Sequence, residues 1–226
     1  MYQILYRSIS IEDTWQLNSC SFKKEKSLRK NGFGYIAGVD EVGRGALAGP
    51  IVAAAVVFDP FVLRGKMKEI TDSKKLTAKK REALGSYIKE KAVDYAIGKV
   101  QVGEIERYGI GAANILAFKR ALDGLKKVDF ALIDGRKFRG LPYEFLCIEK
   151  GDNKSVSIAA ASILAKVHRD NIMTELHKEN GKFFFDSNKG YGEKKHYDAI
   201  IKLGPSKHHR QNFLGEILRR RDTLFK

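Results

Sequence analysis

The sequence contains little cysteine, and its spacing is unsuited to a structural role. Cys20 and Cys147 are the only cysteines among 226 residues, and neither belongs to a CxxC or Cys/His pattern. Disulfide frameworks need more cysteines than this, and structural zinc sites need closely spaced ligands. The sequence therefore excludes both as the basis of the fold.

Long apolar runs are also absent. The longest, residues 46–58, is too short to span a membrane and is broken by Gly49 and Pro50. Residues 1–29 mix charged and apolar side chains and lack the unbroken apolar stretch of a secretory signal. We therefore expect a cytoplasmic protein without a membrane partner.

Acidic residues are scarce relative to basic ones. The chain has 42 Lys and Arg against 27 Asp and Glu, a formal net charge of +15. This excess favours a polyanionic partner such as nucleic acid, although a solvated basic surface is an equally common explanation. The length is that of one compact domain with extensions at its ends. We expect a polar, basic N-terminal extension (1–31), a catalytic domain (32–210) and a basic C-terminal helix (211–226).

The hydrophobic pattern alternates between strands and helices. Strands are expected at 35–40, 51–58, 92–102, 130–134 and 145–149, and helices at 78–91, 114–127, 157–176, 194–203 and 213–224. Thr77 is the expected N-cap of the first of these helices. The glycine-rich link at 43–50 favours antiparallel pairing of the first two strands. The pattern predicts an α/β or α+β domain around one mixed sheet.

Carboxylates follow two of these strands. Asp40 and Glu41 end the first strand before Gly43, and Asp134 ends the fourth. Ligands gather at the carboxyl ends of strands in open sheets, so neighbouring strands would bring these acids together. Consecutive strand residues point to opposite faces, but a turn at Gly43 would let Glu41 swing back. Crowded carboxylates are tolerated when cations neutralise them, and oxygen ligands select Mg²⁺ or Mn²⁺.

A simpler explanation exists for each acid taken alone. Acids often follow strands as turn formers, and Asp152, just before a long helix, is well placed as an N-terminal cap. As a fourth acid, Asp152 would instead complete a two-metal site suited to phosphoryl chemistry. Both interpretations remain open on spacing alone.

Several ordered segments resemble one family. They are 38–50 (GVDEVGRGALAGP), 72–76 (DSKKL), 133–135 (IDG), 150–152 (KGD), 157–170 (SIAAASILAKVHRD), 190–192 with His196 (GYG…H), and 204–206 with His209, Arg210 and Phe213 (GP…HR..F). Together they strongly resemble type 2 ribonuclease H, ribonuclease HII, from about residue 34 to about residue 214.

The resemblance implies a ribonuclease H-like fold: a five-stranded mixed sheet flanked by helices, with a helical C-terminal extension. It implies a metal-dependent endonuclease that hydrolyses the RNA strand of RNA–DNA hybrids. It also implies cutting 5′ to ribonucleotides embedded in duplex DNA, leaving 3′-hydroxyl and 5′-phosphate ends. Asp40, Glu41, Asp134 and Asp152 would be the catalytic acids, holding two Mg²⁺ or Mn²⁺ ions.

The resemblance also assigns substrate contacts. Gly43, Arg44 and Gly45 would read the ribose 2′-hydroxyl, which is the group that distinguishes RNA from DNA. Tyr191 would stack on the sugar of the next deoxynucleotide, and Ser73 and Lys74 would hold a backbone phosphate.

Other features lie outside that pattern. Asp170 stands four residues after Lys166, which favours an ion pair on one helix face over metal binding. Glu193 replaces a threonine usual in the family and adds negative charge near the expected DNA path.

Two other functions compete with this one. A related metal nuclease acting on DNA alone, such as a junction resolvase, would share the acids but would not need a 2′-hydroxyl reader. A non-catalytic basic nucleic-acid-binding protein, such as a ribosome-associated factor, would fit the charge but not the acids. The favoured partners are RNA–DNA hybrids and ribonucleotide-containing duplexes, bound by a monomer.

Overall fold

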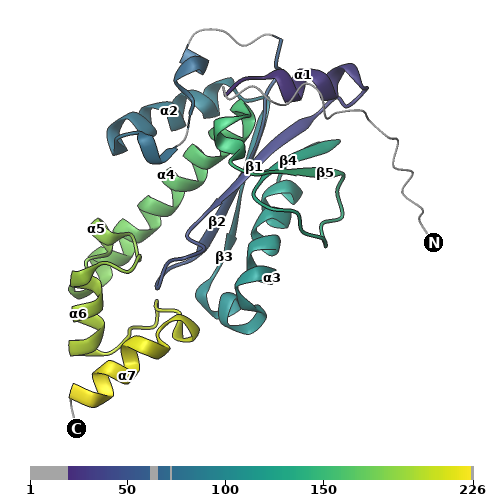
Figure 1. Ribbon diagram of the computed structural model, residues 1–226. Helices are drawn as coiled ribbons and strands as arrows, with labels where there is room; N and C mark the ends of the chain where they lie inside the picture. The colour runs from purple at the N-terminus through teal and green to yellow at the C-terminus, as the bar shows by residue number, and fades with distance from the viewer. Residues whose placement is uncertain (1–19, 62–65, 72, 225–226) are drawn as a thin grey trace.

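The fold is built on one five-stranded sheet. The computed structural model describes residues 20–61, 66–71 and 73–224. The spatial order is β3-β2-β1-β4-β5 (Figure 1). The strands are β1 (Ile36–Val42), β2 (Ile51–Val57), β3 (Asp94–Val100), β4 (Phe130–Asp134) and β5 (Phe145–Ile148). β1, β2 and β3 form an antiparallel meander, whereas β4 and β5 run parallel to β1. The expected mixed sheet, including the antiparallel first pair, is confirmed.

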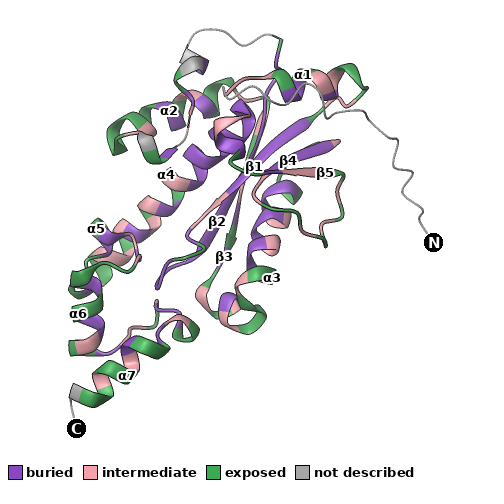
Figure 2. Ribbon diagram, in the orientation of Figure 1, coloured by how far each residue is buried: buried purple, intermediate pink, exposed green. Residues whose placement is uncertain are grey.

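Helices cover both faces of the sheet. On one face α3 (Val102–Asp123) packs against Ala53, Ala55 and Val57 of β2. On the other face α4 (Val156–Glu179), with α2 (Ala78–Lys91) beside it, packs against alternate β2 residues. β2 is consequently buried along its whole length (Figure 2). A strand covered on both faces is a continuous apolar run rather than an alternating one, as the β2 sequence IVAAAVV shows.

The C-terminal helices form a smaller apolar cluster at the far end of α4 (Figure 1). They are α5 (Phe185–Asn188), α6 (Lys194–Leu203) and α7 (Gly215–Leu224). Ala48, in the link between β1 and β2, pairs with His209 through an isolated bridge. The C-terminal part is therefore fastened to the link that follows the first acidic strand.

The N-terminal extension differs from expectation within its described part. Residues 23–30 form helix α1 (Lys23–Lys30), which is packed on the domain rather than solvated along its length. Leu28 is buried in a cluster with Ile36 of β1 and Ile158 of α4. The described part of the extension therefore contacts both the sheet and α4. Residues 1–19 of the extension lie outside the described residues.

The helix expected at 114–127 is longer than the sequence pattern predicted. α3 begins at Val102 and ends at Asp123, and its backbone kinks at Gly109, which has a φ of 78°. Gly103, Gly109 and Gly111 dilute the apolar periodicity of its first half, so the pattern becomes helical only from Asn114. The final helix is also shifted, because a short 3₁₀ turn, η6 (Gln211–Phe213), precedes α7.

The described part of the chain also bears on membrane spans and on the state of the cysteines. No helix there is long and apolar enough to cross a membrane. Cys20 and Cys147 are both free thiols.

Candidate active site

Acidic residues meet at one edge of the sheet. β1 and β4 are parallel, and the last pair of their register is Val39 opposite Ile133. Asp40 and Asp134 are therefore the next residues on these neighbouring strands. Asp40 is buried, and Asp134 is half-buried. Asp152 is buried in the 3₁₀ turn η4 (Gly151–Asn153), directly after β5. The topology thus brings acids from three separate segments to this edge of the sheet.

The charges of these acids act on one another. Burial, followed by the neighbouring charges of Glu41 and Asp134, raises the pKa of Asp40 well above its usual value. Burial and Asp134 raise the pKa of Glu41 to about 7, and Arg44 opposes that rise. Burial also raises the pKa of Asp134, and the charge of Asp152 adds to the effect. Like charges this close disfavour ionisation of one another unless a cation is present.

Backbone and side-chain donors hold the acids in place. The amide of Gly151 donates to Asp134 Oδ1 at 2.6 Å, which ties η4 to the end of β4. The side-chain amide of Asn153 donates to Asp152 Oδ1 at 2.8 Å. The amide of Glu41 donates to Asp40 Oδ1 at 2.7 Å. At least one oxygen of each of these aspartates is therefore engaged by the protein itself.

The acids fit a hard divalent cation in their chemistry. Their donors are carboxylate oxygens, which suit Mg²⁺ and Mn²⁺, and their mutual repulsion is of the kind that a cation relieves. As the side chains stand, no group of three or more His, Cys, Asp or Glu in the described part of the chain is close enough together to hold a metal ion. The topology thus places the acids along one edge of the sheet without converging their oxygens on one point.

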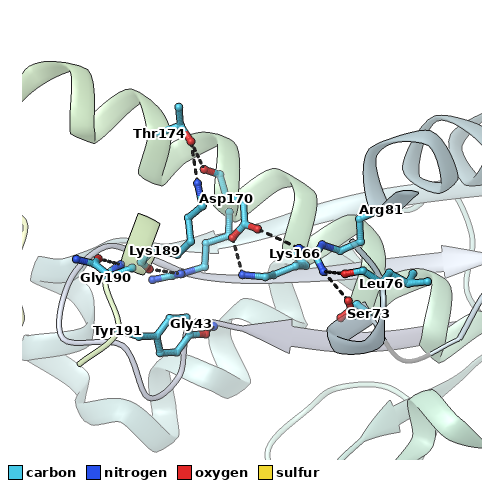
Figure 3. A network of polar contacts seen from close by, with 12 residues as sticks. Gly43, Ser73, Leu76, Arg81, Lys166, Asp170, Thr174, Lys189, Gly190 and Tyr191 are labelled. Carbon is cyan, nitrogen blue, oxygen red and sulfur yellow. Dashed lines mark hydrogen bonds and ion pairs between the residues drawn. The ribbon is translucent and has the colours of Figure 1, made fainter. Parts of the chain in front are cut away.

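A glycine-rich turn lies directly after the acids. Gly43 has a φ of 90°, and a Cβ there would lie 2.2 Å from Arg169 Nε. Its amide donates to the Tyr191 hydroxyl at 3.2 Å, which brings two expected substrate-binding segments together although 148 residues separate them (Figure 3). Arg44 and Gly45 are exposed, and a Cβ on Gly45 would meet nothing within 4 Å. The turn is therefore anchored at Gly43 and open at Gly45.

Two fully buried arginines shape this turn. Arg169 of α4 donates to the carbonyl groups of Ala48, Pro50 and Lys189. Arg210 donates twice to Gly49 O and once to Arg44 O. The Arg169 guanidinium also lies over the Tyr191 ring, 5.2 Å from its centroid. These cations bind backbone carbonyls, so their role is to fix the path of the link and the position of Tyr191.

Tyr191 is also fixed from the C-terminal helices. Its carbonyl oxygen lies 2.8 Å from His196 Nδ1, and His196 Nε2 lies 3.0 Å from His209 Nε2. His209 Nδ1 accepts from the Ser206 amide at 3.0 Å. A carbonyl can only accept and an amide can only donate, so His196 carries its proton on Nδ1 and His209 on Nε2.

The expected phosphate-binding residues have different environments. Ser73 is buried, and its hydroxyl lies 3.0 Å from that of Ser162 on α4. Lys74 is exposed, and its charge opposes the rise in the pKa of Asp134. Asp72 lies outside the described residues.

The expected ion pair on α4 is present. Lys166 Nζ lies 2.6 Å from Asp170 Oδ1, and Arg81 of α2 lies 3.9 Å from Asp170 Oδ2. Arg81 also donates to the carbonyl groups of Ser73 and Leu76 (Figure 3). Through Arg81, Asp170 therefore links α4 to the turn that carries Ser73.

Sequence reasoning missed some residues of the site. Asn114 of α3 hydrogen-bonds Glu41 and opposes the rise of its pKa. Ser162 of α4 hydrogen-bonds Asp40 and opposes the rise of the Asp40 pKa. Asn114 stands at the start of the apolar stretch 114–127 and Ser162 within the alanine-rich helix, where a lone polar residue surrounded by apolar ones was the available signal.

The fold and this acidic edge define a ribonuclease H-like nuclease. The ribonuclease HII family model matches residues 37–215, and the chain belongs to the ribonuclease HII family. It is 46% identical over 196 residues to ribonuclease HII of Caldanaerobacter subterraneus subsp. tengcongensis, covering 86% of this chain and 80% of that protein. It is 52% identical over 193 residues to ribonuclease HII of Clostridium botulinum, covering 84% and 72%.

A solved structure shows the same fold. Ribonuclease H2 from Pyrococcus horikoshii OT3 superposes with a TM-score of 0.70 at 28% identity, covering 85% of this chain and 99% of that one. The chain is accordingly an endoribonuclease of the ribonuclease H class, which acts on RNA–DNA hybrids. Metal dependence is typical of the family.

Proposed function

We propose that the chain, besides acting on RNA–DNA hybrids, cuts duplex DNA on the 5′ side of embedded ribonucleotides, and that it does so by two-metal hydrolysis that leaves 3′-hydroxyl and 5′-phosphate ends. The observation that carries the proposal is that the acids at the end of β1 are followed directly by the turn at Gly43, and that the Gly43 amide donates a hydrogen bond to the Tyr191 hydroxyl. A nuclease specific for DNA would need the acids but not this turn.

The four acids would hold the cations. Asp40 and Asp134 lie side by side, Glu41 follows Asp40, and Asp152 approaches from η4. When bound, two Mg²⁺ or Mn²⁺ ions would supply an activated water and would stabilise charge on the leaving oxygen. The contribution of the chain is to orient the carboxylates and to keep them partly desolvated, where their charges act most strongly.

The substrate contacts follow from the turn and its surroundings. The exposed backbone around Gly45 would approach the ribose and hydrogen-bond the 2′-hydroxyl. Tyr191, held by Arg169, would stack on the neighbouring deoxyribose. Ser73 and Lys74 would hold a backbone phosphate, and the charge of Lys74 acts on Asp134.

The test uses three duplexes of one sequence: all DNA, DNA with one ribonucleotide, and an RNA–DNA hybrid. Purified protein with Mg²⁺ or Mn²⁺ should cut the second on the 5′ side of the ribonucleotide and the third at many positions, and should leave the first intact. The Asp134→Asn protein keeps the shape of the site but loses a charged ligand, so it should bind the duplexes and fail to cut them. Equal cutting of the all-DNA duplex would support the resolvase-like alternative. Binding without cutting by the parent would support a binding protein.

A further inference from the structure

Glu25 of α1 is an acidic residue buried away from the active-site acids. It is 1% exposed, and its Oε1 accepts from the Ser155 hydroxyl at 2.6 Å and from the Ser157 amide at 3.1 Å. Burial raises the pKa of Glu25, and the bonds from Ser155 and Ser157 oppose that rise. Burying a carboxylate is costly unless it is hydrogen-bonded. Both bonds fall on Oε1, and the buried Oε2 has no hydrogen-bond partner among the described residues, so the two bonds to Oε1 are what offsets the burial of this side chain.

These bonds complete the cap of α4. Ser155 is the N-cap of α4, and its hydroxyl oxygen accepts from the Ile158 amide at 3.2 Å. The same hydroxyl donates a hydrogen bond to Glu25 Oε1. Glu25 takes the Ser157 amide, another of the first-turn donors that a helix leaves unpaired. The cap of this 24-residue helix is therefore shared between its own serine and a residue of α1.

The capped end of α4 is continuous with the turn that carries Asp152. The Ser155 amide donates to Gly151 O at 2.8 Å, which closes η4 onto the start of the helix. The Gly151 amide in turn donates to Asp134 Oδ1. A movement of the cap would therefore displace Asp152 relative to Asp134.

The same end of α4 lies against β1 with no spare room. A Cβ at Gly38 would be 2.1 Å from the carbonyl carbon of Ser157, so the two backbones touch two residues before Asp40. Further along α4, Ser162 hydrogen-bonds Asp40. The first turns of α4 consequently set the position of Asp152 on one side and the surroundings of Asp40 on the other.

We propose that Glu25 is a positioning residue: by bonding Ser155 and Ser157 it fixes the start of α4 and thereby the spacing of Asp152 from Asp40 and Asp134. This inference rests on the proposed cation-binding role of those acids. It assigns a part in the site to α1, which precedes the matched family segment 37–215. The reach of the side chain, rather than its charge, is what acts.

Three substitutions distinguish the effect of the length of the Glu25 side chain from the effect of its charge. Glu25→Asp keeps the charge but withdraws the carboxylate by one methylene, and Glu25→Ala removes both bonds. Glu25→Gln keeps an oxygen that can accept from Ser155 and Ser157. Lys23→Ala, at an exposed position of the same helix, is the matched control.

The main measurement is Mn²⁺ binding to the substrate-free protein by titration calorimetry, at a temperature below the melting temperature of every variant. The second measurement is kcat and KM on the single-ribonucleotide duplex. Glu25→Asp and Glu25→Ala should weaken Mn²⁺ binding about tenfold, as the loss of groups that orient metal ligands does, and should lower kcat at limiting Mn²⁺. KM for the duplex should change by less than about twofold, because phosphate contacts dominate that affinity. Glu25→Gln and Lys23→Ala should resemble the parent. If Glu25→Ala does not fold, the Asp variant decides.

A Glu25→Asp protein that binds Mn²⁺ as tightly as the parent would overturn the proposal. A Glu25→Gln protein as weak as Glu25→Asp or Glu25→Ala would overturn it too, because reach alone would then not explain the effect. A parent protein that neither binds Mn²⁺ nor cuts any duplex would instead overturn the proposed function, and the positioning role with it.

Discussion

Replacing Gly45 with alanine separates substrate recognition from protein stability. Gly45 is exposed, its φ lies outside the left-handed region, and an added Cβ would meet nothing within 4 Å. Alanine therefore enters without a clash and reduces the freedom of the unfolded chain. The free energy of unfolding should rise slightly, by up to about 1 kcal/mol.

The same methyl group should interfere with the ribose. If the backbone around Gly45 bonds the 2′-hydroxyl at contact distance, a Cβ holds the sugar away and that bond is lost. A hydrogen bond left unmade in a desolvated site costs about 1–3 kcal/mol, which corresponds to a loss of about 5- to 150-fold in kcat/KM. Binding to all-DNA duplex should stay unchanged, because phosphate contacts do not depend on the turn.

The assay compares kcat/KM on the single-ribonucleotide duplex with the free energy of unfolding in urea. Gly103→Ala is the control, since Gly103 lies in the first turn of α3 and its Cβ would also meet nothing within 4 Å. Gly43→Ala provides the contrast: its φ of 90° and the 2.2 Å approach to Arg169 should make it destabilising in the absence of substrate. A stable Gly45→Ala protein that cuts like the parent would refute the reading of the 2′-hydroxyl by this turn.

Three further outcomes are expected. Tyr191→Ala should lose about 5- to 150-fold in kcat/KM on the single-ribonucleotide duplex. Tyr191→Phe keeps the ring but removes the hydroxyl that accepts from the Gly43 amide, so it should lose about fivefold or less. Equal losses in the two variants would argue against stacking. Burial and the neighbouring His196 lower the pKa of His209 from 6.5 to about 4, so the unfolded chain binds more protons than the folded one between these values. Urea unfolding should therefore show stability falling as pH drops from about 6.5 to about 4, with a shallower fall in His209→Gln, and identical pH profiles would contradict this. The logarithm of duplex affinity should fall linearly with the logarithm of salt concentration, since the net charge is +15; a slope near zero would mean that the basic surface does not contact phosphate.

Local sequence signals predicted the elements that carry the acids. The apolar runs before Asp40 and Asp134 became β1 and β4, and their parallel pairing brought the two acids to one edge. The Thr77 cap is also confirmed, because its hydroxyl accepts from the Lys80 amide at 3.3 Å. These features depend on residues close together in sequence, which pattern analysis handles well.

Long-range contacts could not be predicted in the same way. The hydrophilic segment around Glu25 gave no sign that the Glu25 carboxylate would cap a helix 130 residues away. Arg169 and Arg210 lie in segments that resemble the family, but no role was predicted for either; both are fully buried and bind carbonyls of the link after β1. Such roles depend on partners that only the folded chain brings together.

The central claim is that the acids at the ends of β1 and β4, together with Asp152, form a divalent-cation site, and anomalous scattering from crystals soaked in Mn²⁺ tests it directly. The account predicts an anomalous peak within about 2.2 Å of carboxylate oxygens of Asp40 and Asp134, lost in crystals of Asp134→Asn. Crystals in which Mn²⁺ binds elsewhere on the protein, or in which the peak survives unchanged in Asp134→Asn, would contradict it.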